Sequence, residues 1–226
     1  MECQTHPDIK EFMKIPLFDQ FLYGWVPGNS KFFFPPGTGK KIPRNTDFIV
    51  NIHYAPSPIP ENDLSRINVY FSKEEVTREV KTITITENFI TNQPFRIPAG
   101  KVTTFYSKTP PLQSDLSVIA VLPHMHLLGK SFRAYAITPA GDVIPLIKIN
   151  KWNFNWQNTY QFERLVKIPK SSVIYVEATY DNSSANESNP NDPPKDVAYG
   201  WNTTDEMMNF IIYCLDYKEG DEFWDY

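Results

Sequence analysis

A largely apolar run at residues 116–122 ends one residue before the motif His124-Met125-His126. A short run rich in Val, Ile and Leu is typical of a buried β-strand. Side chains at positions i and i+2 of a strand project from the same face. If the strand continues past Pro123, the two imidazoles therefore lie side by side and close enough to bind one metal ion. Met125 would then point to the opposite face.

The rest of the chain has the pattern of a succession of short strands. Aromatic residues make up 15% of the 226 residues, and 20 prolines interrupt the aromatic and β-branched runs. This pattern is typical of an all-β sandwich with long loops. The segment Pro-Ala-Gly-Asp at 139–142 is a hairpin signal, and one helical turn is expected near 72–76. The expected strands are 48–54, 66–71, 81–86, 117–122, 132–138, 143–149, 160–168, 173–179 and 210–217.

The composition argues against two classes of partner. The formal net charge is -4 and there is no long basic run, so nucleic acid is not an expected partner. No apolar stretch reaches the roughly 18 residues that a membrane-spanning helix needs. A basic segment followed by an apolar one is also missing, so no signal peptide is expected in this sequence.

Histidines and methionines are the candidate metal ligands. Two same-face histidines at a strand end favour a metal site over two separate structural groups. His53 ends another apolar run, and there a hydrogen-bonded core histidine is the better interpretation. Zinc usually needs three or four His, Cys or carboxylate ligands, whereas copper accepts imidazole and, as Cu(I), thioether. Met207 follows a polar stretch, 203–206, and taken alone would be interpreted as core packing.

Taken together, these motifs resemble a known family. The stretch Pro-His-Met-His-Leu-Leu-Gly-Lys at 123–130, followed by Thr-Asp-Glu-Met at 204–207, resembles the copper type II, ascorbate-dependent monooxygenases. These enzymes include peptidylglycine alpha-hydroxylating monooxygenase and dopamine beta-monooxygenase. Nearly the whole chain takes part in the resemblance, and the bacterial branch is favoured. Further similar stretches are Trp-Val-Pro-Gly at 25–28, Trp-Asn-Phe-Asn-Trp-Gln at 152–157 and Tyr-Asp-Asn-Ser at 180–183.

The resemblance implies a set of copper ligands. In the family, the H-x-H pair and the Met of D-E-M bind the copper at which oxygen is activated. His124, His126 and Met207 would accordingly be the ligands and the catalytic centre here. His53 would be one ligand of a second, electron-transferring copper. That second site also needs an adjacent His-His pair upstream, and no such pair precedes His53, so this site is incomplete in the sequence.

Neighbouring positions imply how the site differs from that of the peptide-amidating members. Those enzymes carry an arginine where this chain has Leu122 and a tyrosine where it has Ile211, whereas Asn209 matches and would lie on the substrate side. Without the arginine, a substrate carboxylate loses its charge-assisted hydrogen bond, so peptide amidation is not expected. Asp205 and Glu206 are expected to orient the loop that carries Met207.

The resemblance also implies a domain organisation of two jelly-roll-like β-sandwiches. Residues 1–80 would be the C-terminal part of an incomplete N-terminal domain. Residues 81–226 would be the C-terminal domain that carries the H-x-H and Met site. Because copper oxygenases of this type usually act outside the cytoplasm, a secreted or periplasmic location is expected.

The expected function is that of a copper-dependent monooxygenase. It would hydroxylate a C–H bond of a small molecule, using O2 and an electron donor such as ascorbate. The alternative is a non-catalytic copper-binding β-sandwich derived from this family, and the missing His-His pair is the feature that separates the two. A carbohydrate-binding sandwich, based on Trp152, Trp156 and Tyr160, comes third.

Overall fold

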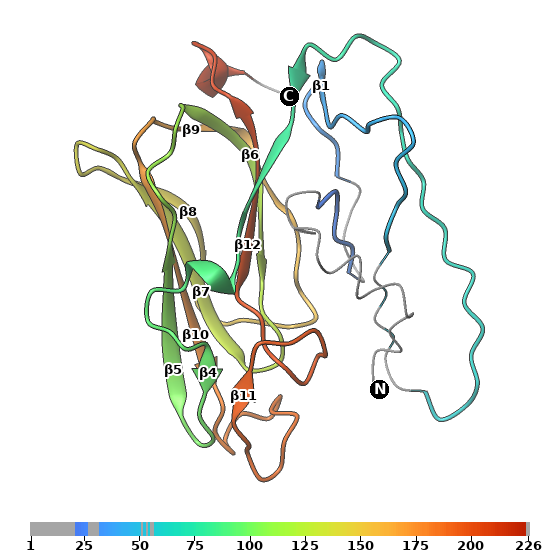
Figure 1. Ribbon diagram of the computed structural model, residues 1–226, viewed down its shortest axis with the longest axis vertical. Coiled ribbons are helices and arrows are strands. Elements are labelled where there is room, and N and C mark those ends of the chain that lie inside the picture. The colour runs from blue at the N-terminus through green and yellow to red at the C-terminus, as the bar shows by residue number, and fades with distance from the viewer. Residues whose placement is uncertain (1–20, 27–31, 51, 53, 55–56, 225–226) are drawn as a thin grey trace.

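The computed structural model describes the chain except for residues 1–20, 27–31, 51, 53, 55–56 and 225–226. Its main body consists of two four-stranded antiparallel sheets that pack face to face (Figure 1). This architecture confirms the expected all-β sandwich. In order across each sheet, the first contains β3 (Lys81–Ile85), β12 (Asn209–Asp216), β6 (Leu116–His124) and β9 (Tyr160–Ile168), and the second contains β5 (Val102–Lys108), β10 (Val173–Asp181), β7 (Gly129–Ile137) and β8 (Val143–Ile149).

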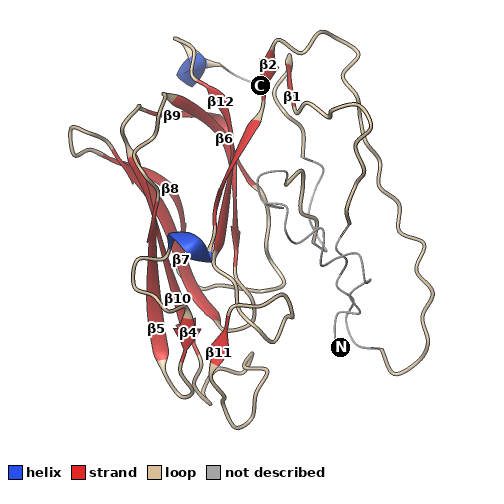
Figure 2. Cartoon of the chain, viewed as in Figure 1, coloured by secondary structure: helices blue, strands red, loops and turns tan. Residues whose placement is uncertain are grey.

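The remaining regular elements are short, and Figure 2 shows loops over most of the rest of the described chain. No helix in the described part is long and apolar enough to cross a membrane. The short elements are the parallel pair β1 (Thr38–Gly39) and β2 (Arg78–Glu79), the antiparallel pair β4 (Arg96–Ile97) and β11 (Val197–Ala198), and the 3₁₀ helices η2 (Glu87–Phe89) and η3 (Asp221–Phe223).

Strands β6 and β12 are buried on both faces, which explains why they read as continuous apolar runs. Their inner face packs against the second sheet, as Val121 and Ile212 do in the main core. Their outer face carries a second apolar cluster that includes Leu122, Ile211 and Tyr213. The aromatic side chains Phe21, Phe32 and Phe34 cover this outer cluster.

A local irregularity in β6 decides which face His124 occupies. Tyr213 of β12 pairs with Ala120, but the next residue pairs with Val118, so Ile119 is the extra residue of a β-bulge. Beyond the bulge the strands stay in register up to the pair His124 and Asn209. Directly opposed residues of an antiparallel pair share a face. Both side chains therefore lie on the outer face of the first sheet, at the end of the apolar cluster.

Most of the predicted strands after residue 80 are confirmed, two of them with the same bounds, 143–149 and 160–168. Strand β5 was not predicted. Its sequence Val-Thr-Thr-Phe-Tyr-Ser-Lys has only Phe105 and Ser107 as buried positions, so its apolar alternation is weak. Pairing with β10 along its whole length supplies the stability that the local pattern does not show.

The strands and the helical turn that were predicted before residue 80 are not found where the structure describes the residues. The described residues of 48–54, and all of 66–71, form no strand. Their apolar side chains are exposed, Tyr70 and Phe71 each by 76%. A strand needs a hydrogen-bonded neighbour, and no described residue pairs with either segment. The expected helical turn at 72–76 is a bend, in which Ser72 Oγ donates to the Glu74 carbonyl at 2.8 Å.

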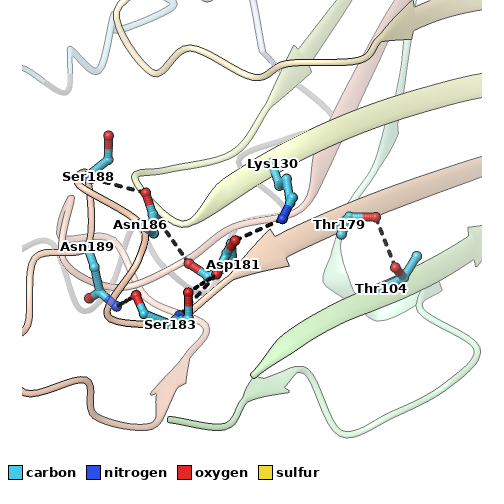
Figure 3. Close-up of polar contacts among 8 residues, drawn as sticks. All are labelled: Thr104, Lys130, Thr179, Asp181, Ser183, Asn186, Ser188 and Asn189. Atoms are coloured by element: carbon cyan, nitrogen blue, oxygen red, sulfur yellow. Dashed lines mark hydrogen bonds and ion pairs between the residues drawn. The ribbon is translucent and has the colours of Figure 1, made fainter. Parts of the chain in front are cut away.

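The polar loop after β10 is held in place by side-chain hydrogen bonds centred on Asp181 (Figure 3). One carboxylate oxygen accepts from Ser183 Oγ at 2.6 Å, and the other pairs with Lys130 Nζ at 2.9 Å. Asn186 Nδ2 donates to the Asp181 carbonyl at 2.7 Å and its side-chain oxygen accepts from Ser188 N at 3.0 Å. Because Lys130 lies in β7, the loop is fixed beside the turn that carries His126.

A buried ion pair ties the end of the chain to the first sheet. Both oxygens of Asp221 accept from the Arg78 guanidinium at 2.7 Å, and one also accepts from Ser117 Oγ at 2.5 Å. Burial alone would raise the pKa of Asp221, but these bonds and one from Lys218 N lower it to about 2. Ser117 belongs to β6 and Arg78 to β2, so one carboxylate connects three parts of the fold.

Replacing this carboxylate is expected to weaken the fold in a pH-dependent way. Asp221→Asn should lower the free energy of unfolding by about 2 kcal/mol at pH 7, since a pKa held nearly two units below its ordinary value stabilises by about that amount. The folded pKa is depressed, so the contribution is complete above about pH 4 and disappears as the pH falls towards 2. Urea titrations of both proteins at pH 7 and pH 3 measure this. A difference that grows on acidification would contradict it.

Candidate metal centre

The two histidines lie at the end of β6 and in the turn that follows it. β6 ends at His124, and the amide of Gly129 bonds back to the His126 carbonyl at 3.3 Å to close the turn. The strand thus continues past Pro123 as far as His124, and His126 lies beyond its end. Pro123 has no N–H, and it lies beyond Val121, the last residue of β6 that pairs with β9. The chain is thus free to leave the sheet after His124.

The turn nevertheless brings the two imidazoles together. Their ring centroids are 5.0 Å apart and their planes meet at 83°. His126 is buried and His124 partly so. The ring of Phe154 packs edge-on to His126, with 6.2 Å between centroids. Met125 points into the core between the sheets, as expected from alternation.

Hydrogen bonds fix which nitrogen of each imidazole carries the proton. His126 Nδ1 lies 3.0 Å from the carbonyl oxygen of Asp205. A carbonyl only accepts, so this nitrogen is the donor. His124 Nδ1 lies 2.6 Å from Gln157 Oε1. The Gln157 amide nitrogen donates to the Phe154 carbonyl at 2.8 Å, which directs Oε1 at the imidazole. In both rings, Nε2 is therefore the nitrogen with the lone pair that a metal requires.

The carboxyl group of Glu206 holds the histidine turn and the methionine loop together. One oxygen accepts from Leu128 N at 2.6 Å, and the other accepts from His126 N at 2.9 Å and Met207 N at 3.3 Å. The side chain is completely buried. Burial outweighs these three bonds and raises the pKa of Glu206 to about 8. The predicted role of this residue in orienting the loop agrees with these contacts.

Hydrogen bonds with neighbouring residues hold Met207 close to the histidine turn. Its side chain is buried, and the Tyr180 hydroxyl donates to its carbonyl at 2.7 Å. The sulfur accepts a hydrogen bond from Asn209 Nδ2 at 3.5 Å. Asn209 in β12 is the direct pairing partner of His124 in the neighbouring strand β6. The thioether is thus linked to the histidine strand through a single amide side chain.

Two contributors to this site were not given a role from sequence. Gln157 lies in the stretch 152–157, which counted towards the resemblance, but no local pattern shows that it reaches a histidine 33 residues away. Tyr180 precedes the polar loop and is fully buried among aromatic residues of the core. Asp205, in contrast, acts on His126 through its backbone carbonyl, while its carboxylate accepts from Asn202 Nδ2 at 2.9 Å.

The other candidate residues differ in their positions. His53 lies outside the described residues. Leu122 and Ile211 are cross-strand partners within the outer apolar cluster. Trp152 packs in the core against Phe132, with 6.3 Å between ring centroids, so its face is not available to stack on a sugar.

Comparison with known proteins identifies the family. Residues 79–221 match the family described as copper type II ascorbate-dependent monooxygenase, C-terminal domain. The chain belongs to this family. It is also similar to the human protein named "Putative DBH-like monooxygenase protein 2", with 24% identity over 178 residues. The match covers 73% of this chain and 35% of the human protein, so the chain spans about a third of that relative's length.

The donor atoms fit the copper on which this family depends. No group of three or more His, Cys, Asp or Glu side chains suited to a metal occurs in the described part of the chain, which leaves no conventional zinc set there. Two imidazoles with fixed tautomers and a nearby thioether form a different set, one that suits copper and Cu(I) in particular. Asn209 Oδ1, buried without a hydrogen-bond partner, adds an unsatisfied polar atom beside them.

Proposed function

We propose that this chain is the oxygen-activating part of a copper-dependent monooxygenase that hydroxylates a C–H bond of a small molecule. The observation that carries the proposal is the pair of imidazoles 5.0 Å apart, each with Nδ1 occupied by an acceptor. His124, His126 and Met207 would hold the copper. When bound, copper supplies the activation of O2, with electrons from a donor such as ascorbate. Residues 81–226 would form the C-terminal domain, and residues 1–80 part of the N-terminal one.

The protein's own contribution is to position the two imidazoles and the methionine loop. Gln157 and the Asp205 carbonyl hold the two rings in the tautomer that presents Nε2. Glu206 fixes the turn against the methionine loop through three backbone amides. Burial of His126 and Met207 keeps water from part of the site, which protects reactive intermediates from side reactions.

The position at which the peptide-amidating members carry an arginine is apolar in this chain. Leu122, two residues before His124 on the same face, belongs to the apolar cluster of the sheet. A side chain added at Gly24 would come within 3.5 Å of Leu122, so the chain closes over this position. A substrate carboxylate near His124 would therefore lack the cation that the peptide-amidating enzymes supply from this position.

A glycine-extended peptide is therefore not expected to be hydroxylated. Incubation with copper, ascorbate and O2 should leave such a peptide unchanged within the detection limit of mass spectrometry, which reads the added oxygen directly. Accumulation of the α-hydroxylated peptide over many turnovers would contradict the assignment of this face as apolar.

The proposed activity is tested by isotope incorporation. The copper-loaded protein is incubated with ascorbate, ¹⁸O2 and a set of uncharged aromatic and aliphatic small molecules, and products are analysed by mass spectrometry. We expect one ¹⁸O atom in a hydroxylated product and none with His124→Ala. Ascorbate-dependent oxygen consumption without labelled product in any member of the set would favour the alternative below.

A non-catalytic copper-binding sandwich is the second candidate. The 226-residue sequence contains no adjacent His-His pair, which the second copper of the family needs. On this proposal the chain binds one copper and does not turn over substrate. In either case, we propose that the protein acts outside the cytoplasm, as the resemblance implies.

A further inference from the structure

The backbone of Met207 is fixed on both sides, but its sulfur is not fixed by the backbone. The amide donates to Glu206 Oε2 at 3.3 Å and the carbonyl accepts from the Tyr180 hydroxyl at 2.7 Å. Rotation about two side-chain bonds, Cα–Cβ and Cβ–Cγ, still decides where Sδ lies. Methionine is an adaptable side chain that settles into whatever space is available. Some further contact must therefore select the position of the sulfur.

Asn209 supplies that contact. Its Nδ2 donates to Met207 Sδ at 3.5 Å, and its side chain is almost fully buried, with 2% of the residue exposed. It lies in β12 directly opposite His124, so its own position is set by the strand pairing. Since β6 also carries His124, the amide connects the sulfur to a ring that the sheet already holds.

We infer that Asn209 is a positioning residue for the thioether of Met207. This inference rests on the proposed copper site and gives Asn209 a role distinct from the substrate-side one predicted from sequence. A thioether sulfur has two lone pairs and is a weak acceptor. With one lone pair directed at the amide N–H, the other is held in a defined direction for a metal.

The expected consequence differs between the two oxidation states of copper. Thioether is a soft ligand and contributes chiefly to binding of Cu(I). Loss of a residue that orients a metal ligand typically weakens metal binding by about 10–100-fold. Removal of the amide should therefore weaken Cu(I) binding about tenfold and leave Cu(II) binding nearly unchanged. When Cu(I) binding weakens tenfold and Cu(II) binding does not change, the Cu(II)/Cu(I) reduction potential of the site falls by about 59 mV.

The experiment compares four variants with the wild-type protein. Asn209→Leu keeps a similar shape without the N–H donor, Met207→Leu removes the sulfur, and the double variant combines both. Tyr213→Phe is the control, because it alters the same strand and face but removes a hydroxyl that donates to the Leu22 carbonyl, at 3.4 Å. Chelator competition gives the Cu(I) and Cu(II) affinities, and X-ray absorption at the copper edge detects the sulfur ligand.

The expected result is a selective loss of Cu(I) affinity and a weaker sulfur signal in Asn209→Leu. The same substitution should have no further effect once Met207 is leucine, because a positioning residue acts only through its target. The control should match the wild type. If Asn209→Leu does not fold, Asn209→Ser, whose shorter side chain cannot reach the sulfur, replaces it throughout.

Two outcomes would overturn the inference and leave the proposed function standing. One is unchanged Cu(I) affinity and sulfur signal in Asn209→Leu when Met207→Leu has lost both. The other is additive losses in the double variant, which would mean that Asn209 acts independently of the sulfur. Failure of the wild-type protein to bind copper at all would reject the proposed function and this inference together.

Discussion

Replacing either His124 or His126 with alanine is expected to abolish stoichiometric copper binding and, with it, any oxygenase activity. Each ring supplies one of the two imidazole donors that the described residues bring to the proposed site, and their centroids are 5.0 Å apart. A single remaining imidazole and a thioether form too small a set for tight binding. Copper content after dialysis should fall from one equivalent to less than about a tenth, consistent with the loss of a first-row metal ligand.

The two adjacent methionines provide a matched control for this prediction. Met207 lies beside Asn209, whereas the side chain of Met208 packs in the core between the sheets. Leucine is a volume-conserving replacement for a buried methionine and usually costs less than about 1.5 kcal/mol. Met207→Leu should weaken Cu(I) binding and Met208→Leu should not. Equal effects of the two substitutions would mean that the sulfur of Met207 has no special role.

Replacing Glu206 with glutamine is expected to lower the free energy of unfolding of the copper-free protein by about 3 kcal/mol. The carboxyl group faces three backbone amides with both of its oxygens. Glutamine has one acceptor oxygen, so its NH2 group must face at least one of those N–H donors in a buried place. Urea unfolding at pH 5 measures the loss, and Glu177→Gln, at an incompletely buried residue of β10, should change stability by less than about 1 kcal/mol.

The difference in unfolding free energy between the wild type and Glu206→Gln is expected to depend on pH in one direction. Burial raises the folded pKa of Glu206 to about 8 from an ordinary value of 4.5. The fold favours the protonated form of Glu206. The resulting stabilisation is complete below pH 4.5 and is lost as the pH rises through 8. The wild-type advantage over Glu206→Gln should therefore shrink between pH 5 and pH 9. An advantage that increases over this interval would show that the carboxylate is ionised in the fold.

Periodic burial made much of the second half of the chain predictable. Strand β8 at 143–149 and strand β9 at 160–168 have the predicted bounds, because both are rich in aliphatic or aromatic residues between turn signals. Strand β6 was visible as a run because both of its faces are covered. Strand β5 was missed because Thr and Ser occupy positions where an apolar side chain would have marked the inner face.

Long-range contacts explain what the sequence could not show about the site. The H-x-H spacing suggested two neighbouring imidazoles, and they are neighbours, but a turn held by Glu206 brings them together, not a continued strand. Nothing local indicates that Gln157 would reach His124, or that the Asp205 carbonyl would reach His126. These bonds join segments that are 33 and 79 residues apart, and only the folded chain reveals them.

The apolar residues at 48–54 and 66–71 predicted strands that the structure does not contain among its described residues, and the missing requirement is a pairing partner. Alternating apolar residues favour a strand when a neighbour is available to pair with it. In the described part of the chain these side chains are exposed, among them Ile67 at 62% and Phe71 at 76%. The pattern alone could not reveal whether a pairing partner is present.

The most direct test of the copper assignment is X-ray absorption at the copper edge of the reduced, copper-loaded protein, combined with metal analysis. The account predicts one copper per chain with two imidazoles and one sulfur as its ligands, and loss of the sulfur signal in Met207→Leu but not in Met208→Leu. Copper bound without a sulfur neighbour, or retained in full by His124→Ala, would contradict it.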